Sequence, residues 1–221
     1  MEIEFCKLPT NVTFVDNHRT PRGSKCRTIC FTEKGELFVS CDDNIDYHTE
    51  GMGERTTQRT SEDVLSAVAL SSGELLTLLA DGSIQKMPYP FHDEWERFLE
   101  IEDAIRIAVS NDNLFILTRS AEEDAITCYN MVTREQNTHR FEDTKFVSIA
   151  CASDGDILVV DQQKGILYKY GISNNQEFCP KLIWSRDGLQ GAYSVCVDQQ
   201  DQIYVAADEQ MVYMVNDDGK T

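Results

Sequence analysis

Acids are the residues that most readily suggest chemistry, because 38 of the 221 residues are Asp or Glu. Glycoside hydrolysis needs two carboxyl groups roughly 5–9 Å apart whose pKa values differ. With so many acids, a pair at that separation arises by chance, so composition alone gives a hydrolase no support. The chain also has no G-x-S-x-G, P-loop or H-E-x-x-H motif. We therefore expect no catalytic residues, with a hydrolase of the glycosidase or lactonase type as an alternative.

A second candidate for chemistry is a set of aspartates that recur after apolar segments. They are Asp42, Asp43, Asp81, Asp161 and Asp208. Such a ring of carboxylates would resemble a set of metal ligands, but Asp also caps tight turns through its own side chain. The corresponding place in the third segment holds Arg119 and Ser120, which breaks a symmetric set. We expect turn residues here, and no metal or cofactor.

The cysteines and histidines are too scattered for a zinc site. The eight cysteines include no C-x-x-C pair, and the four histidines lie far apart in the sequence. The cysteines lie in apolar segments, which predicts free thiols packed as small hydrophobic side chains. Reduced thiols in turn predict a cytoplasmic or nuclear location.

The most unusual local feature is a basic segment, residues 17–32, which carries a net charge of +4 in a chain of net charge −18. Its cations are Arg19, Arg22, Lys25 and Arg27. Pro21 and Gly23 predict a loop. A loop of this kind could bind an acidic peptide or a phosphate group of a partner. The alternative is a solvated loop attracted to the acidic surface of its own protein.

A second candidate for partner binding is the acidic segment 93–103, with six acids and one arginine around Trp95 and Phe98. Aromatic side chains within an acidic surface can bind a basic partner, because aromatics dominate interface energetics and acids steer the encounter. The alternative is an amphipathic segment that packs Trp95 and Phe98 against the rest of the fold. The pattern fits a short helix and an outer strand equally well.

These residues are positioned by a five-fold internal repeat of an apolar strand, a polar turn and a second, more apolar strand. The first apolar residues after the turns are Leu37, Leu75, Leu114, Ile157 and Ile203, at spacings of 38, 39, 43 and 46 residues. A period of this length with several short strands per unit is typical of a β-propeller blade. The repeat therefore predicts an all-β fold, a five-bladed β-propeller.

The composition of each strand predicts its place in the blade. The second strands are nearly continuous apolar runs, as expected of strands covered on both faces. The first strands carry small residues that suit the crowded axis: Ala67, Ala69, Ala108, Ala150 and Ala152. The polar stretches 54–60, 134–141 and 176–184 would be outer edge strands.

We predict a single domain over residues 1–221, with repeat units at about 25–60, 64–100, 103–142, 145–185 and 191–221. The last unit supplies three strands, and the segment 1–8 contains a short alternating strand around Ile3–Phe5. Pairing of this N-terminal strand with the last blade would close the ring. The alternative is a fragment of a longer propeller.

Two units resemble the repeats of known propeller families. Residues 193–220 look like an NHL repeat, with an apolar strand, an Asp-containing turn and a closing NDDGK, and residues 147–170 are similar. The strict WD40 signature is absent, since the chain has neither a Trp-Asp dipeptide nor a Gly-His pair. The resemblance to NHL and WD40 propellers implies a rigid platform for protein partners and, in some members, RNA.

The function most consistent with these sequence features is a non-enzymatic scaffold for protein–protein interaction. Such a scaffold would be a subunit or domain of a larger complex and would present the loops on one face of the ring to its partners. The net charge of −18 argues against nucleic acid and against anionic lipid. No signal sequence and no membrane-spanning apolar run is visible. An RNA-binding propeller of the NHL type is the alternative from another class, supported by the basic segment alone.

Overall fold

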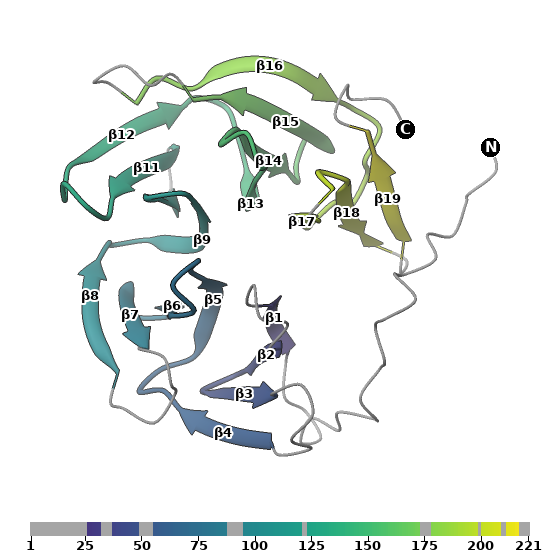
Figure 1. The fold of residues 1–221 in the computed structure, drawn as a ribbon. Coiled ribbons are helices and arrows are strands. Elements are labelled where there is room, and N and C mark those ends of the chain that lie inside the picture. The colour runs from purple at the N-terminus through teal and green to yellow at the C-terminus, as the bar shows by residue number, and fades with distance from the viewer. Residues whose placement is uncertain are drawn as a thin grey trace.

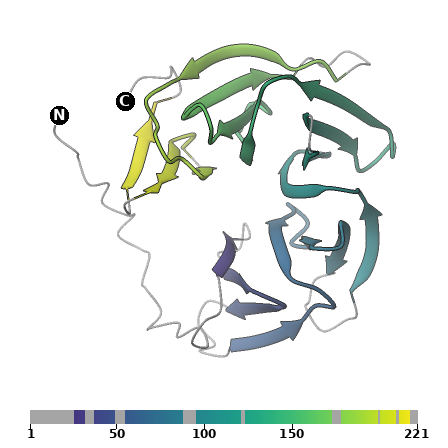
Figure 2. The same cartoon turned by 180° about the vertical axis from the view of Figure 1, so that it is seen from behind.

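The computed structural model describes residues 26–31, 37–48, 55–87, 95–120, 123–172, 178–198, 200–208 and 211–216 of the chain. They form nineteen β-strands in five antiparallel sheets. The sheets surround a central axis as the blades of a five-bladed β-propeller (Figure 1), which confirms the predicted fold class. Figure 2 shows the same ring from behind.

Each blade begins with a strand near the axis and continues outward. The innermost strands are β1 (Cys26–Phe31), β5 (Val64–Ala69), β9 (Ala104–Ser110), β13 (Phe146–Cys151) and β17 (Ser194–Val197). The second strands are β2 (Leu37–Cys41), β6 (Leu75–Leu79), β10 (Asn113–Arg119), β14 (Ile157–Asp161) and β18 (Ile203–Ala207). The repeat period therefore places the aligned leucines and isoleucines at the first or second residue of each second strand.

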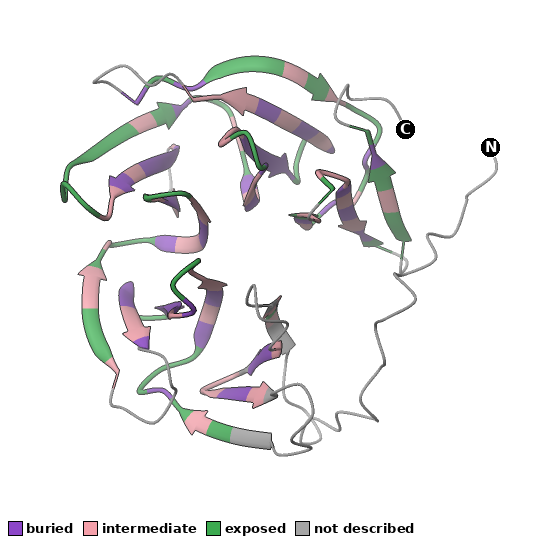
Figure 3. Ribbon diagram, viewed as in Figure 1, coloured by how far each residue is buried: buried purple, intermediate pink, exposed green. Residues whose placement is uncertain are grey.

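The outer half of each blade is more exposed. The third strands are β3 (Asn44–His48), β7 (Ser83–Met87), β11 (Asp124–Asn130), β15 (Ile166–Gly171) and β19 (Met211–Val215). The outermost strands are β4 (Arg55–Arg59), β8 (Glu96–Glu100), β12 (Gln136–Phe141) and β16 (Lys181–Arg186). Figure 3 shows buried residues gathered on the inner strands and exposed residues on the outer ones. The polar composition of the outer strands thus follows from their exposure.

The hydrophobic core is divided into four clusters, each between two neighbouring blades. Successive residues of the second strand alternate between the two clusters on either side of their blade. In β6, Leu75 and Leu79 pack toward the first blade, whereas Leu76 and Leu78 pack toward the third. Because both faces of such a strand are buried, a continuous apolar run replaces the usual alternation.

The fifth sheet contains three described strands, in the order β17–β18–β19. The predicted closing strand at residues 1–8 lies outside the described residues, so pairing of the N-terminal segment with the last blade stays a prediction. Within the described ranges, no helical segment has the length and apolar character that a membrane crossing requires.

Candidate functional site

All five innermost strands begin at the same face of the ring, which we call the proximal face. Because the strands of a blade are antiparallel, the connections between second and third strands lie there too, for example at residues 80–82 and 162–165. The opposite, distal face carries the connections between first and second strands, such as residues 152–156, and between third and outer strands, such as residues 131–135.

A repeated β-bulge shapes the centre of the proximal face. In β5 and β13 the pairing with the second strand skips one residue, between Val64 and Ser66 and between Phe146 and Ser148. In β9 the pairing likewise passes over Ile105. A bulge leaves the extra residue unpaired and redirects its side chain. The bulge residues Leu65, Ile105 and Val147 consequently line a single cavity.

This cavity, which we call the axial mouth, has a volume of about 330 Å³. It is lined by Leu65, Ile105, Arg106, Arg119, Val147 and Tyr193. Four blades contribute to it, so it surrounds the axis at the proximal face. Its described lining residues include two arginines and no acid, in a chain whose net charge is −18.

Arg106 occupies a position at which three other innermost strands carry serine. Ser66 and Ser148 each accept a hydrogen bond from the next blade, from the N–H of Ile107 at 3.3 Å and the N–H of Val195 at 3.1 Å. Arg106 instead donates from Nη1 to the carbonyl oxygens of Leu65 and Ile105, at 3.0 and 2.8 Å. These bonds hold its guanidinium group at the axial mouth.

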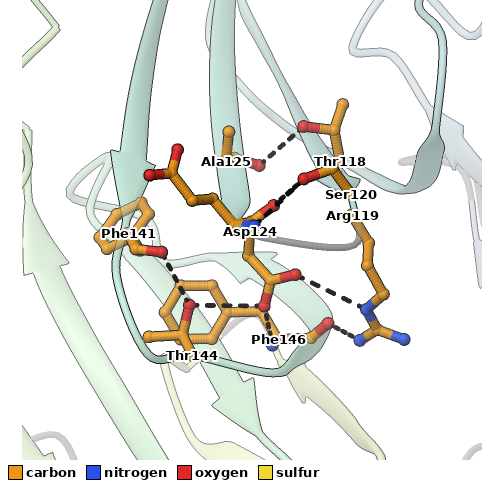
Figure 4. A network of polar contacts seen from close by, with 9 residues as sticks. Thr118, Arg119, Ser120, Asp124, Ala125, Phe141, Thr144 and Phe146 are labelled. Atoms are coloured by element: carbon orange, nitrogen blue, oxygen red, sulfur yellow. Dashed lines mark hydrogen bonds and ion pairs between the residues drawn. The ribbon is translucent and has the colours of Figure 1, made fainter.

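Arg119 and Asp124 together bind the first residue of the fourth blade (Figure 4). The Asp124 carboxylate accepts the N–H of Phe146 at 2.5 Å, and Arg119 Nη2 donates to the Phe146 carbonyl oxygen. Arg119 Nε lies 3.6 Å from Asp124 Oδ1, which is an ion-pair distance. Asp124 is buried and Arg119 is one-third exposed, so only the arginine faces the axial mouth.

The distal face carries a charged cluster between the fourth and fifth blades. The buried Lys169 ammonium lies 3.1 Å from Asp154 Oδ2 and 3.5 Å from Asp156 Oδ2. In the neighbouring turn, Ser153 donates its N–H to Asp201 Oδ1 at 2.8 Å, and its hydroxyl also bonds that carboxylate. Each acid therefore has a partner that explains its place as a turn or ion-pair residue.

The pKa values of the distal acids differ in direction. Burial and the nearby Asp154 charge raise the pKa of Asp156. The pKa of Asp154 is lowered: burial opposes ionisation, but the N–H of Asp156 and the Lys169 ammonium outweigh it. Hydrogen bonds from Ser153 lower the pKa of Asp201. Among the described residues, no three His, Cys, Asp or Glu side chains are grouped as metal ligands would be.

The cysteines whose side chains the structure describes are free thiols, and burial raises the pKa of Cys30, Cys128, Cys151 and Cys196. Cys30, Cys128 and Cys151 pack against the core clusters as predicted, and burial raises the pKa of Cys30 to about 12 and that of Cys128 to about 11. An attacking thiol needs a lowered pKa, so these two are not activated nucleophiles. Cys179 and Cys196 are exposed, and the prediction of core packing is wrong for them.

The basic segment predicted as a docking loop falls mostly outside the described residues, which begin at residue 26. Arg19, Arg22 and Lys25 lie in the part that is not described. Arg27 is part of β1, where the pairing with β2 skips between Cys26 and Thr28. The backbone of Arg27 is thus at the same bulge position as Leu65, Ile105 and Val147.

Trp95 and Phe98 lie at the outer strand β8 and are both partly buried. Trp95 packs against the cluster between the first and second blades, and Phe98 against the one between the second and third. The Phe98 ring meets Tyr129 edge to face, with centroids 5.7 Å apart. The structure therefore shows residues Glu96–Glu100 of this segment as an outer strand, and the packing of both aromatics favours a structural role over partner binding.

Two of the recurrent aspartates bond within the turns that connect the second and third strands, as expected. Asp81 Oδ1 accepts hydrogen bonds from the N–H and hydroxyl of Ser83, at 2.9 and 2.6 Å. Asp161 Oδ1 accepts the N–H of Lys164 at 3.1 Å. Asp42 adopts a left-handed backbone conformation, with φ of 50°, which Asp tolerates better than most residues.

Sequence reasoning did not identify Arg106 and Tyr193 as candidate site residues, and it treated Arg119 only as a break in a pattern. A signal for Arg106 was present. When the innermost strands are aligned, Arg106 stands where the other strands have Thr28, Ser66, Ser148 and Ser194. An arginine among small hydroxyl residues at one register position is a departure that the repeat alone makes visible.

The comparisons with known proteins identify the fold of the chain. No family model and no curated protein sequence matches it. A putative gluconolactonase structure is similar with a TM-score of 0.67 at 13% identity, over 90% of this chain and 80% of that one. The streptogramin B lyase structure gives a TM-score of 0.67 at 10% identity, over 88% of this chain and 66% of that one. The WD40 β-propeller domain of Doa1 gives a TM-score of 0.64 at 14% identity, over 89% of this chain and 66% of that one. These likenesses show a propeller fold.

Proposed function

We propose that this chain is a non-enzymatic protein-interaction module that binds its partners at the proximal face. The observation that carries the proposal is the axial mouth. In this site, two arginines that are oriented by hydrogen bonds and one tyrosine lie next to aliphatic side chains. Such a mixture of side chains is typical of the core of a protein interface.

The rigidity of the ring supports this function. Its blades are joined by four buried clusters and by main-chain contacts such as those of Phe146. A partner that binds a pre-formed face loses less conformational entropy than one that must order it. Similar solved structures include a WD40 domain and a chain of a mitotic checkpoint complex, the latter with a TM-score of 0.65 at 11% identity. We propose a comparable place for this chain, as a subunit or domain of a cytoplasmic or nuclear complex.

Because some proteins of similar fold are enzymes, the function is argued from the chemistry of the site residues rather than from the shape of the chain. The described part of the axial mouth presents guanidinium groups, a phenol and aliphatic carbons, and none of the paired carboxylates that glycoside hydrolysis uses. RNA binding would need several phosphate-contacting cations, and the net charge of −18 opposes it.

The proposal is tested by quantitative affinity capture from lysate with three baits: the wild-type chain, Tyr193→Glu and Val132→Glu. Tyr193 lies at the axial mouth and is 46% exposed, whereas Val132 lies on the distal face and is 70% exposed. Both changes add one carboxylate at an exposed site, so both variants should fold.

We expect the wild-type and Val132→Glu baits to capture one set of proteins in equal amounts. The Tyr193→Glu bait should bind the same proteins about tenfold more weakly, a difference of ~1.4 kcal/mol in binding free energy. Equal retention by Tyr193→Glu, or no protein retained by wild type, would overturn the proposal. Capture that disappears after nuclease treatment would favour the RNA-binding alternative instead.

A further inference from the structure

The fifth blade is buried on one of its two faces only. In the second strands β6 and β14 every residue is buried, because each of these strands has a neighbouring blade on both sides. In β18 the burial alternates: Ile203, Val205 and Ala207 are buried, whereas Tyr204 and Ala206 are half-buried. Alternation of this kind is typical of a sheet with one covered and one open face.

Six side chains share the open face, and the register of β17, β18 and β19 aligns them in two rows. The rows are Ser194–Ala206–Val212, nearer the proximal face, and Cys196–Tyr204–Met214, nearer the distal face. Val212 is 59% exposed and Met214 is 37% exposed (Figure 3). The opposite face of the same blade packs into the cluster shared with the fourth blade, so the open face is turned towards the first blade.

The boundary between the fifth and first blades differs from the other four. Each of those has a buried cluster, and its two innermost strands contact each other. Among the described residues no buried cluster and no comparable contact joins β17 to β1. On the side of the first blade, Ile29 is 62% exposed, while the next residue, Cys30, packs in the opposite direction, against the second blade. Large apolar side chains of both blades are thus left exposed at this boundary.

The connections between blades indicate which part of the chain reaches this boundary. Four described connections lead from an outermost strand to the next innermost strand and cross the proximal face from the rim towards the axis. They are residues 60–63, 101–103, 142–145 and 187–193. The corresponding connection into the first blade ends at β1. If the segment 1–8 forms the outermost strand of the fifth blade, as the sequence predicts, then residues 9–25 make this crossing.

Residues 9–25 are longer than any of the four described connections, and their apolar side chains are concentrated in one place. Their only large apolar residues are Val12, Phe14 and Val15. A path from the rim to the axis at this boundary runs along the row Ser194–Ala206–Val212. That row crosses three strands and so spans about 10 Å, which is the length of about three extended residues.

We propose that residues 12–15 pack against the open face of the fifth blade and complete a fifth buried cluster with it. The inference goes beyond the proposed function, which concerns the axial mouth. A tethered segment is present at an effective concentration on the order of millimolar, so it occupies the face ahead of a partner protein. A second copy of the chain is disfavoured because two net charges of −18 repel each other.

The first test is a double-mutant cycle in the full chain with Phe14→Ala, Val212→Ala and the double variant, measured by urea denaturation. Side chains in contact have effects on the unfolding equilibrium constant that do not simply multiply, with a coupling of about threefold or more. The matched control is the cycle of Phe14→Ala with Val132→Ala, since Val132 is 70% exposed but lies on the distal face of the third blade. We expect the coupling with Val212 and none with Val132.

The second test needs no substitution. In NMR spectra of the chain labelled at its Val and Met methyl groups, we expect nuclear Overhauser contacts between the Phe14 ring and the methyl groups of Val212 or Met214. Absence of these contacts, absence of coupling with Val212, or equal coupling with both valines would each overturn the inference. A dimer in sedimentation that Val212→Glu dissociates would also overturn it, because the open face would then be occupied by a second copy.

Discussion

The buried carboxylate of Asp124 accepts the main-chain N–H of Phe146 at 2.5 Å, across the boundary between the third and fourth blades. Phe146 opens the innermost strand of the fourth blade, and its carbonyl oxygen is bonded by Arg119. These two contacts of Phe146 together fix the position of a blade and the orientation of an arginine at the axial mouth. The stability of the ring and the geometry of the axial mouth are therefore coupled at this point.

Asp124→Ala tests how much this contact contributes to stability. It leaves the Phe146 N–H buried without an acceptor and removes the ion-pair partner of Arg119. We expect the free energy of unfolding to fall by about 2–3 kcal/mol, measured by urea denaturation. The control is Glu142→Ala, an exposed acid in the turn after β12, which should change stability by less than about 0.5 kcal/mol. Equal effects of the two changes would contradict this account.

The glycine at position 82 should not tolerate a side chain. Gly82 has a φ of 83°, and a Cβ atom there would lie 2.6 Å from the Ile101 carbonyl oxygen. Gly188 shares the left-handed backbone, with a φ of 80°, but a Cβ atom would meet nothing within 4 Å. We expect Gly188→Ala to cost about 1 kcal/mol from backbone strain, and Gly82→Ala clearly more. Equal melting temperatures for the two variants would show that the Ile101 contact carries no cost.

The distal acids should respond to substitution in opposite directions. The pKa of Asp154 is lowered, so its charge stabilises the fold at neutral pH, and this contribution is lost as the pH falls through its pKa. The pKa of Asp156 is raised, so its ionised form is disfavoured in the fold at neutral pH. At pH 7 we expect Asp154→Asn to lower the free energy of unfolding and Asp156→Asn to raise it, each by about 0.5–1 kcal/mol.

The check is urea denaturation of both variants at pH 7 and at pH 3. The difference between them should shrink at pH 3, where the carboxylates are largely protonated. A difference that is the same at both pH values would assign the effect to packing rather than to charge.

The predicted closure of the ring is tested by removing residues 1–8. The fifth sheet has three described strands, and the sequence predicts that the segment around Ile3–Phe5 pairs with it. We therefore expect the truncated chain to lose stability and to exchange the amide hydrogens of β19 (Met211–Val215) faster, as measured by mass spectrometry. Unchanged exchange in β19 would show that the N-terminal segment does not pair with the last blade.

The sequence allowed the architecture to be predicted because the feature that identifies it is repeated. Each second strand is apolar throughout since both of its faces are buried, and β6 and β14 show this with every residue buried. Few other folds are compatible with five copies of one pattern at a nearly constant spacing. The turn role of Asp81 and Asp161 was predictable for the same reason.

The candidate site was less predictable, because it depends on where side chains point. Whether Arg106 faces the axis or a neighbouring blade is decided by a bulge in β9, and the sequence does not mark the bulge. The acidic segment 93–103 was ambiguous because its pattern suits both a short helix and an outer strand. Only its pairing with β7 shows that Trp95 and Phe98 lie between blades.

Cross-linking of a captured complex tests the central claim, partner binding at the proximal face, most directly. Lys145 and Lys164 are exposed at that face, whereas Lys181 is exposed where β16 begins at the distal face. A short amine-reactive cross-linker, with products mapped by mass spectrometry, should join partner proteins to Lys145 and Lys164 in preference to Lys181. Cross-links concentrated at Lys181, or an even distribution over the three lysines, would contradict the account.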